Sequence, residues 1–198
     1  MDFSKKEIKH IITERFPFLS KKDVECFLNI TTYEKKKKKE IIVDVGNRSD
    51  QVFYILKGFV RGFIINELGQ EKSILLRSEG YFVGDAEKLF YDLPQKYTYV
   101  AIKETHVLYL KYNDFESLAL INPKIAQLLL NVFKEIIAAQ SYRIESVILK
   151  NAKKRYLDFI EKKPDLLKEI DSKYIANFIG ITPVSLSRIQ KEIKDSSK

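Results

Sequence analysis

The chain has 198 residues, 45% of them apolar and 12% aromatic, which is enough to bury a sizeable core in one large domain or two small ones. A single cysteine, Cys26, excludes a disulfide framework and any cluster that needs four thiolates. No window approaches the uninterrupted apolar length of a membrane span, and the first residues lack a secretory signal, so we expect a soluble, cytoplasmic protein.

The positive charge is concentrated near the C-terminus. The formal net charge is +8, and the last 49 residues hold 12 Lys and Arg against seven Asp and Glu. This balance favours a polyanionic partner for the C-terminal part of the chain. The five lysines Lys35–Lys39 are interpreted differently, as a solvated lead into a strand rather than as a phosphate-binding patch.

The predicted elements begin with two short amphipathic helices. Ser4 with Glu7 forms a capping box at the start of the first helix, and Ser20 can cap the second. From residue 40 to residue 111, short β-rich runs alternate with turn signals, and six of the seven glycines lie in this block. Closely spaced short strands with this punctuation predict a small antiparallel β-roll or barrel.

A long helix is predicted after the strands, with Asn122 as its N-cap and Pro123 at its first position. One apolar seam of the kind that pairs helices comprises Ile125, Leu129, Val132, Ile136 and Ala139. A second apolar stripe comprises Leu128, Phe133 and Ile137. A face this wide needs two partners, the β-roll on one side and a second subunit on the other. Burial wholly within its own domain is the alternative.

Residues 172–191 have the pattern of a helix-turn-helix. Ala176 is small where the first helix passes closest to the second, and Gly180 lies at the turn, where glycine adopts the required backbone conformation at little cost. Thr182 is predicted to cap the second helix, with Pro183 at its first position. Both helices supply the shared apolar core: Ile175, Ile179, Ile181, Leu186 and Ile189.

The outer face of the second helix is polar and basic. Its outward residues are Thr182, Pro183, Val184, Ser185, Ser187, Arg188 and Lys191. Arg188 can make a bidentate contact with a guanine edge, Lys191 suits the phosphate backbone, and the hydroxyl groups can reach phosphates or bases. Pro183 and Val184 offer only apolar contact. This face predicts double-stranded DNA as a partner, and an ordinary helical hairpin with a polar outer face is the alternative.

The order of a β-roll, a long pairing helix and a C-terminal helix-turn-helix resembles the Crp/Fnr type of transcription regulators. The resemblance rests on "DQVFYILKGFVRGFIINELGQEKSILL", "EGYFVGD" and "YIANFIGITPVSLSRIQKEI". It implies a cyclic-nucleotide-binding fold and a homodimer on a palindromic operator, with the two recognition helices in successive major grooves about 34–36 Å apart. RNA polymerase is a further candidate partner. Members of the family usually continue into a β-hairpin wing, for which this sequence has no residues after "KDSSK".

The same resemblance places a candidate effector site in "GDAEKLFYDLPQKYTY". Members that bind cyclic AMP carry a cassette that begins with Gly-Glu and ends with Arg-Ser or Arg-Thr. Here the ligand-binding candidates are Gly84, Asp85, Lys96, Tyr97 and Thr98. Asp85 is a shortened carboxylate, and a lysine cannot supply the planar fork of an arginine. The adenine-contacting positions on the long helix hold Ile137 and Ala138. These departures argue against cyclic AMP and favour another small-molecule effector or an empty pocket.

Other chemistry has little support in the sequence. His10 and His106 are interpreted as surface or packing residues rather than haem ligands, and no metal-ligand cluster is present. There is no Ser/His/Asp or Cys/His set, so we predict no catalytic residue and no enzyme activity.

We therefore predict an α+β protein with an N-terminal antiparallel β-roll flanked by helices, a long dimerisation helix and a small all-α helix-turn-helix domain without a β-wing. Residues 1–121 form the sensor domain, 122–150 the dimerisation helix and hinge, and 151–198 the DNA-binding domain. The predicted function is a dimeric, sequence-specific DNA-binding transcription regulator. The alternative is a ligand-binding β-roll whose helix-turn-helix is only a packing unit.

Overall fold

The computed structural model describes residues 2–47 and 50–196. It begins with two helices, α1 (Lys5–Arg15) and α2 (Lys21–Asn29). The Ser4 hydroxyl accepts a hydrogen bond from the Glu7 N–H at 3.3 Å, and the Glu7 carboxylate accepts one from the Ser4 N–H at 2.8 Å. Ser20 and Asp23 repeat this reciprocal arrangement at α2. Both predicted helix starts are confirmed.

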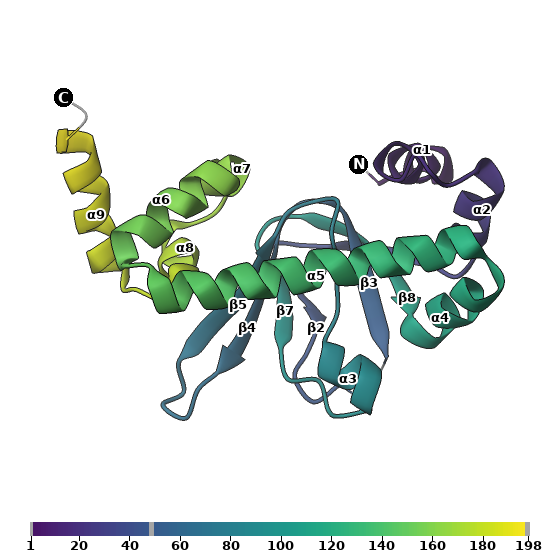
Figure 1. The fold of residues 1–198 in the computed structure, drawn as a ribbon, viewed down its shortest axis with the longest axis horizontal. Coiled ribbons are helices and arrows are strands. Elements are labelled where there is room, and N and C mark those ends of the chain that lie inside the picture. Colours follow the sequence, from purple (N-terminus) through teal and green to yellow (C-terminus); the bar gives the residue numbers. More distant parts are fainter. Residues whose placement is uncertain (1, 48–49, 197–198) are drawn as a thin grey trace.

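Eight strands in the described residues form two four-stranded antiparallel sheets, in the orders β1-β8-β3-β6 and β2-β7-β4-β5. Their bounds are β1 (Thr32–Lys36), β2 (Ile41–Val43), β3 (Gln51–Lys57), β4 (Val60–Ile65), β5 (Glu71–Arg77), β6 (Phe82–Val83), β7 (Thr98–Ala101) and β8 (Thr105–Lys111). The sheets remain distinct, so the predicted antiparallel roll is confirmed and the barrel alternative is wrong (Figure 1).

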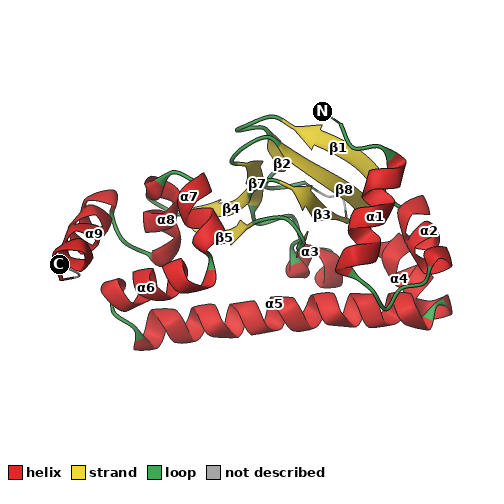
Figure 2. Ribbon diagram, turned by 90° about the horizontal axis from the view of Figure 1, so that it is seen from above, coloured by secondary structure: helices red, strands yellow, loops and turns green. Residues whose placement is uncertain are grey.

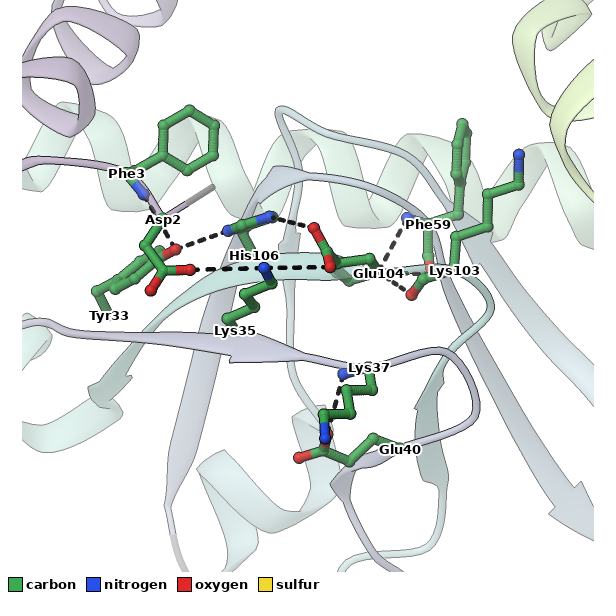
Figure 3. Close-up of polar contacts among 11 residues, drawn as sticks. Asp2, Phe3, Tyr33, Lys35, Lys37, Glu40, Phe59, Lys103, Glu104 and His106 are labelled. Atoms are coloured by element: carbon green, nitrogen blue, oxygen red, sulfur yellow. Dashed lines mark hydrogen bonds and ion pairs between the residues drawn. The ribbon is translucent and has the colours of Figure 1, made fainter.

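The lysine run belongs partly to a strand. Lys35 and Lys36 lie in β1, so the interpretation of the whole run as a lead into a strand is wrong for these two residues. The Tyr33 hydroxyl lies 2.7 Å from Nδ1 of His106 on β8, and Lys35 pairs with Glu104 at 3.1 Å (Figure 3). Cross-strand contacts to a partner distant in the sequence thus outweigh the low strand propensity of lysine. His106 is buried against Phe3, and burial lowers its pKa, as expected for a packing histidine.

Two helices directly follow the last strand, before the C-terminal helices, and a short one precedes β7. The helices are α3 (Ala86–Tyr91), α4 (Tyr112–Ile121) and α5 (Pro123–Leu149). The Asn122 side chain caps α5 by accepting hydrogen bonds from the N–H groups of Lys124 at 2.9 Å and Ile125 at 3.3 Å. Its amide also donates to Asp23 at 2.7 Å, which joins the start of α5 to α2. Figure 1 shows α5 running past both sheets from the N-terminal helices to the C-terminal helices.

The C-terminal segment is helical throughout its described part. It comprises α6 (Ala152–Lys162), α7 (Pro164–Glu169), α8 (Ser172–Ile179) and α9 (Pro183–Ser196). These helices gather at one end of α5, and α9 lies outermost in both views (Figure 1, Figure 2).

Three apolar clusters hold these parts together. On one face of β3, Val52, Tyr54 and Leu56 pack beneath the helices α1, α2, α4 and α5. On the other face, Phe53 and Ile55 pack against the opposite sheet. Because both faces are covered, the strand is apolar along its length. The third cluster joins α6, α7, α8 and α9 and also includes Leu76 and Ile102 of the roll. The sensor and C-terminal regions therefore share a core, and the predicted division into three domains stays a prediction.

Candidate functional site

The turn between α8 and α9 has the predicted helix-turn-helix geometry. Gly180 adopts φ +81° and caps α8, a conformation that an L side chain rarely takes. The Ile181 N–H donates to the Ala176 carbonyl at 2.9 Å, and Ala176 itself is fully buried. The Thr182 hydroxyl accepts from the Ser185 N–H at 3.1 Å, which satisfies one of the free N–H groups at the start of α9.

The core of this unit also matches the prediction. Ile175, Ile179 and Leu186 are buried, and Ile181 and Ile189 pack against them. Because both helices bury their apolar faces on the same cluster, α9 is fixed in orientation and its opposite face points outward.

That outward face carries the residues predicted to contact DNA. Exposed residues are Thr182, Pro183, Val184, Ser187, Arg188 and Lys191. Val184 keeps 62% of its surface accessible, a large value for an apolar side chain. Ser185 is half-buried, and its hydroxyl lies 3.0 Å from that of Thr182, so it serves the helix cap.

A contact that sequence reasoning missed docks this unit onto the roll. The Asn177 side chain of α8 donates to the Glu71 carbonyl at 2.8 Å and accepts from the Ser73 N–H. Both partners lie on β5, an edge strand, so the amide side chain meets the strand edge as another strand would. Arg61 on β4 also stacks over Tyr174 of α8 at 4.9 Å. An asparagine between the apolar neighbours Ala176 and Phe178 was the only sequence signal for this contact.

The long helix α5 has a wide apolar face, as predicted, but the structure divides it differently. Ile125, Leu128 and Val132 are buried against the helices and the outer face of a sheet, and Leu129, Phe133 and Ile136 pack against the same cluster. The predicted pairing seam therefore faces the protein's own core.

Of the predicted second stripe, Leu128 and Phe133 pack on the core and only Ile137 is exposed. Ile137 belongs to a different apolar stripe on α5 that remains uncovered. Its residues, each more than half exposed, are Leu130, Ile137, Ile144, Val147, Ile148 and Leu149. Leu130, Ile137 and Ile144 recur at heptad spacing, the repeat of a two-helix interface. Figure 2 shows the rest of the molecule on one side of α5, which leaves the other side open.

The predicted effector residues come together around one loop. Asp85 is buried, caps α3 through the Glu87 N–H at 3.1 Å and accepts from the Lys96 N–H at 2.8 Å. The Lys96 ammonium pairs with Glu87, and that hydrogen bond raises its pKa. The Thr98 hydroxyl donates to Asp44 at 2.8 Å. Each of these polar side chains thus already has a partner within the protein. The helix α3 inside this loop was not predicted.

Aromatic rings fill the space between the sheets beside that loop. Tyr99 is buried, its ring lies 5.6 Å from that of Phe53, and its hydroxyl donates to the Gly84 carbonyl at 3.1 Å. The ring packs so closely on Gly62 that a Cβ there would lie 2.8 Å from Tyr99 Cε1. Burial raises the pKa of Tyr99 and also that of neighbouring Tyr97. The Tyr99 ring therefore occupies interior space beside the candidate effector loop.

Residues 2–47 and 50–196 contain no group of three or more His, Cys, Asp and Glu side chains that could hold a metal ion. Over the same ranges, no helix has both the length and the hydropathy that spanning a membrane requires.

The comparisons with known proteins by sequence and by structure point to the same group of proteins. Residues 33–122 match the model of the cyclic nucleotide-binding domain. The cAMP-activated global transcriptional regulator CRP of Salmonella typhimurium is 23% identical over 185 residues, which cover 88% of each chain. Among solved structures, FixK2 of Bradyrhizobium japonicum superposes with a TM-score of 0.73 at 17% identity, covering 85% of this chain and 86% of that one.

In sequence and in fold, the chain is similar to transcription regulators of the Crp/Fnr type. Another Crp/Fnr-like fold is that of CLP from Xanthomonas campestris, described as a c-di-GMP responsive global regulator, with a TM-score of 0.70 at 13% identity over 88% of this chain and 91% of that one. The family is one of transcription regulators, and its members named here respond to different effectors. Similarity to Crp/Fnr-type regulators therefore leaves the effector of this chain open.

Proposed function

We propose that the protein is a homodimeric transcription regulator that binds double-stranded DNA through α9 and acts in the cytoplasm. The observation that carries the proposal is the exposed, polar and basic face of α9 on a helix-turn-helix whose turn, caps and core are in place. The basic C-terminal segment adds charge for phosphate contacts. The relatives are regulators rather than enzymes, which supports a non-catalytic role.

The uncovered stripe on α5 is the proposed dimer interface. Two copies related by a two-fold axis would bring Leu130, Ile137 and Ile144 against the same residues of the partner. The dimer would then present two copies of α9 to a palindromic operator, with half-sites one helical turn apart.

Selection of DNA sites from a random pool, followed by binding measured against salt, tests this function. A regulator should select one palindromic sequence, and its affinity should fall steeply as salt rises, because bound phosphates release counterions. Recovery of no consensus, together with salt-independent binding, would contradict the proposal.

Replacing Arg188 by alanine should relax specificity at one base pair in each half-site and cost roughly 1–3 kcal/mol of binding free energy per contact. Among the described residues, Arg188 forms no ion pair, so its removal should leave the fold intact. The matched variant Lys191→Ala should weaken binding to all sequences alike and reduce the salt dependence. Unchanged site selection by Arg188→Ala would show that this side chain reads no base.

The effector is proposed to be a molecule other than cyclic AMP. Tyr99 fills the interior beside Asp85, and the Asp85 carboxylate already accepts two backbone N–H groups. We expect cyclic AMP to leave both the melting temperature and the operator affinity unchanged, with the Salmonella relative as positive control. A saturable heat of binding in calorimetry would contradict this expectation.

One observation favours a second function, a ligand-binding module whose helix-turn-helix only packs. Asn177 ties α8 to β5, so the C-terminal unit has a structural role within the chain. This alternative predicts weak binding to every DNA sequence, which the same selection experiment would detect.

A further inference from the structure

A cavity of about 220 Å³ lies where the roll, the long helix and the C-terminal helices meet. Its walls come from β5 and from three helices, α5, α6 and α8, that follow much later in the sequence. Much of the lining is apolar, with Leu76, Ala139, Phe159 and Ile179 among its residues. The predicted effector residues of the roll do not line this cavity, so it is separate from that site.

Among the residues that the structure describes, five cationic side chains line the same cavity: Arg77, Arg143, Arg155, Lys162 and Lys163. Within that described lining, the one carboxylate is that of Asp158, and it is already held by Lys150, by Lys154 at 3.7 Å and by the Tyr142 hydroxyl at 2.9 Å. The cavity therefore has a large excess of positive charge.

Two of these cations, Arg143 and Lys163, contact only neutral groups. Lys163 donates to the Leu76 carbonyl at 2.9 Å, and Arg143 reaches the Ser73 carbonyl at 3.4 Å. Both also approach the Phe178 ring, Arg143 at 4.3 Å and Lys163 at 5.6 Å. Neither side chain forms an ion pair with a carboxylate in the described residues.

The pKa values of three of these cationic side chains are lowered, as expected for positive charges that lie close together away from water. Burial, together with the positive charges of Arg77 and Arg143, lowers the pKa of Lys163 to about 7. Burial also lowers the pKa of Arg143, with a contribution from Arg155. Burial lowers that of Arg77 as well, although Tyr81 and Glu135 partly oppose the shift. Glu135 is itself paired with Arg15 at 3.1 Å.

Buried like charges that repel one another are stabilised by an anion placed between them. A guanidinium presents a planar fork of donors that matches a carboxylate or phosphate group, and Lys163 has further N–H donors beyond the one it uses. The apolar walls would accept the hydrocarbon part of a small molecule, and the volume excludes a large polymer.

We propose that this cavity binds a small molecule through an oxyanion group, a phosphate or a carboxylate, held by Arg143 and Lys163. Because Arg143 lies on α5, Lys163 follows α6 and their carbonyl partners lie on β5, the bound anion clamps the C-terminal helices to the roll. This clamp adds to the one that Asn177 makes on the same strand. The regulatory consequence, an α9 whose position depends on the anion, rests on the function proposed above.

Titration calorimetry on the full chain tests the proposal, with sulfate as a non-titrating oxyanion and chloride at equal ionic strength as the reference. Sulfate should bind saturably. Slightly above neutral pH, binding should take up protons, because the anion raises the pKa of Lys163. Buffers of different ionisation heat measure this uptake. Inorganic phosphate and succinate then distinguish the phosphate class from the carboxylate class.

Variants distinguish binding of sulfate at this specific site from general screening of the protein's positive charge. Lys163→Met and Arg143→Gln should each weaken sulfate binding by roughly tenfold or more, and Lys163→Met should abolish the proton uptake. The exposed Lys168 of α7 gives the matched control, since Lys168→Met removes one charge outside the cavity and should bind normally. Equal binding by all three variants, or no saturable binding of sulfate, phosphate and succinate to the wild type, would overturn the proposal. Because these measurements use no DNA, failure of the proposed regulator function would leave their outcome unaffected.

Discussion

Replacing Ile137 by aspartate is expected to convert the dimer into monomers. Ile137 is 64% exposed at the middle of the uncovered α5 stripe, so the substitution removes little from the core of one chain. In a two-fold interface it would place two carboxylates in apolar surroundings, close to each other and without partners. Sedimentation should give a mass near 23.2 kDa instead of twice that value.

The loss of operator binding should be a larger effect of Ile137→Asp than the twofold change in mass. A dimer engages both half-sites as one unit, and separating the two recognition helices removes an advantage of about 10²–10⁴ in affinity. The matched control is Ala138→Asp, since Ala138 is exposed on the same helix but lies about 100° further round its axis. This variant should remain dimeric. A dimeric Ile137→Asp protein with unchanged operator affinity would place the interface elsewhere.

Comparison with the sequence shows which features of α5 were predictable. Its start at Asn122-Pro123 and its wide apolar face follow from local rules, and both are present. The side of the helix that meets the core does not follow from those rules, because both stripes have helical periodicity. The pairing seam was expected to include Ile136, which in fact packs on the protein's own core. An aspartate there is expected to destabilise the fold rather than the proposed dimer.

The helix-turn-helix was predictable almost residue by residue. Gly180, Thr182 and the apolar positions serve contacts within twenty residues, so their spacing alone specifies the arrangement. The side-chain contacts within the roll were harder to predict from the sequence. Asp85 was expected from the resemblance to face a ligand, whereas it caps α3 and holds the backbone of Lys96. That role depends on where the chain returns after α3, which no local pattern specifies.

The cationic cavity could not be found from the sequence. Arg77, Arg143 and Lys163 lie far apart along the chain, and each resembles an ordinary surface cation when considered alone. They meet only because α5 passes β5 and the chain then turns back into α6. The excess of lysine and arginine near the C-terminus suggested a polyanionic partner. The structure turns some of that charge inward, where it serves a different purpose from DNA binding.

Lys163 gives a second prediction of large effect, on stability. The unfolded chain has a lysine pKa near 10.5, whereas in the folded protein the pKa of Lys163 is about 7. Between these values the unfolded state binds more protons than the folded state, so stability should rise with pH. Below pH 7 both states are protonated, and the full cost of a half-buried charge without a carboxylate partner is present. Lys163→Met removes that charge and should stabilise the protein most at low pH.

Urea unfolding at several pH values measures this difference directly. The advantage of Lys163→Met over the wild type should be a few kcal/mol below pH 7 and should shrink by at most about 1.4 kcal/mol per pH unit as pH rises toward 10.5. The other charged side chains that line this cavity in the described residues are unchanged by the substitution: Arg77, Arg143, Arg155, Asp158 and Lys162. Lys168→Met should show no comparable pH-dependent gain. Saturating sulfate should reduce the advantage of Lys163→Met, because an anion that neutralises Lys163 removes the strain that the substitution relieves. A pH-independent difference between Lys163→Met and the wild type would mean that Lys163 keeps its ordinary protonation in the folded state.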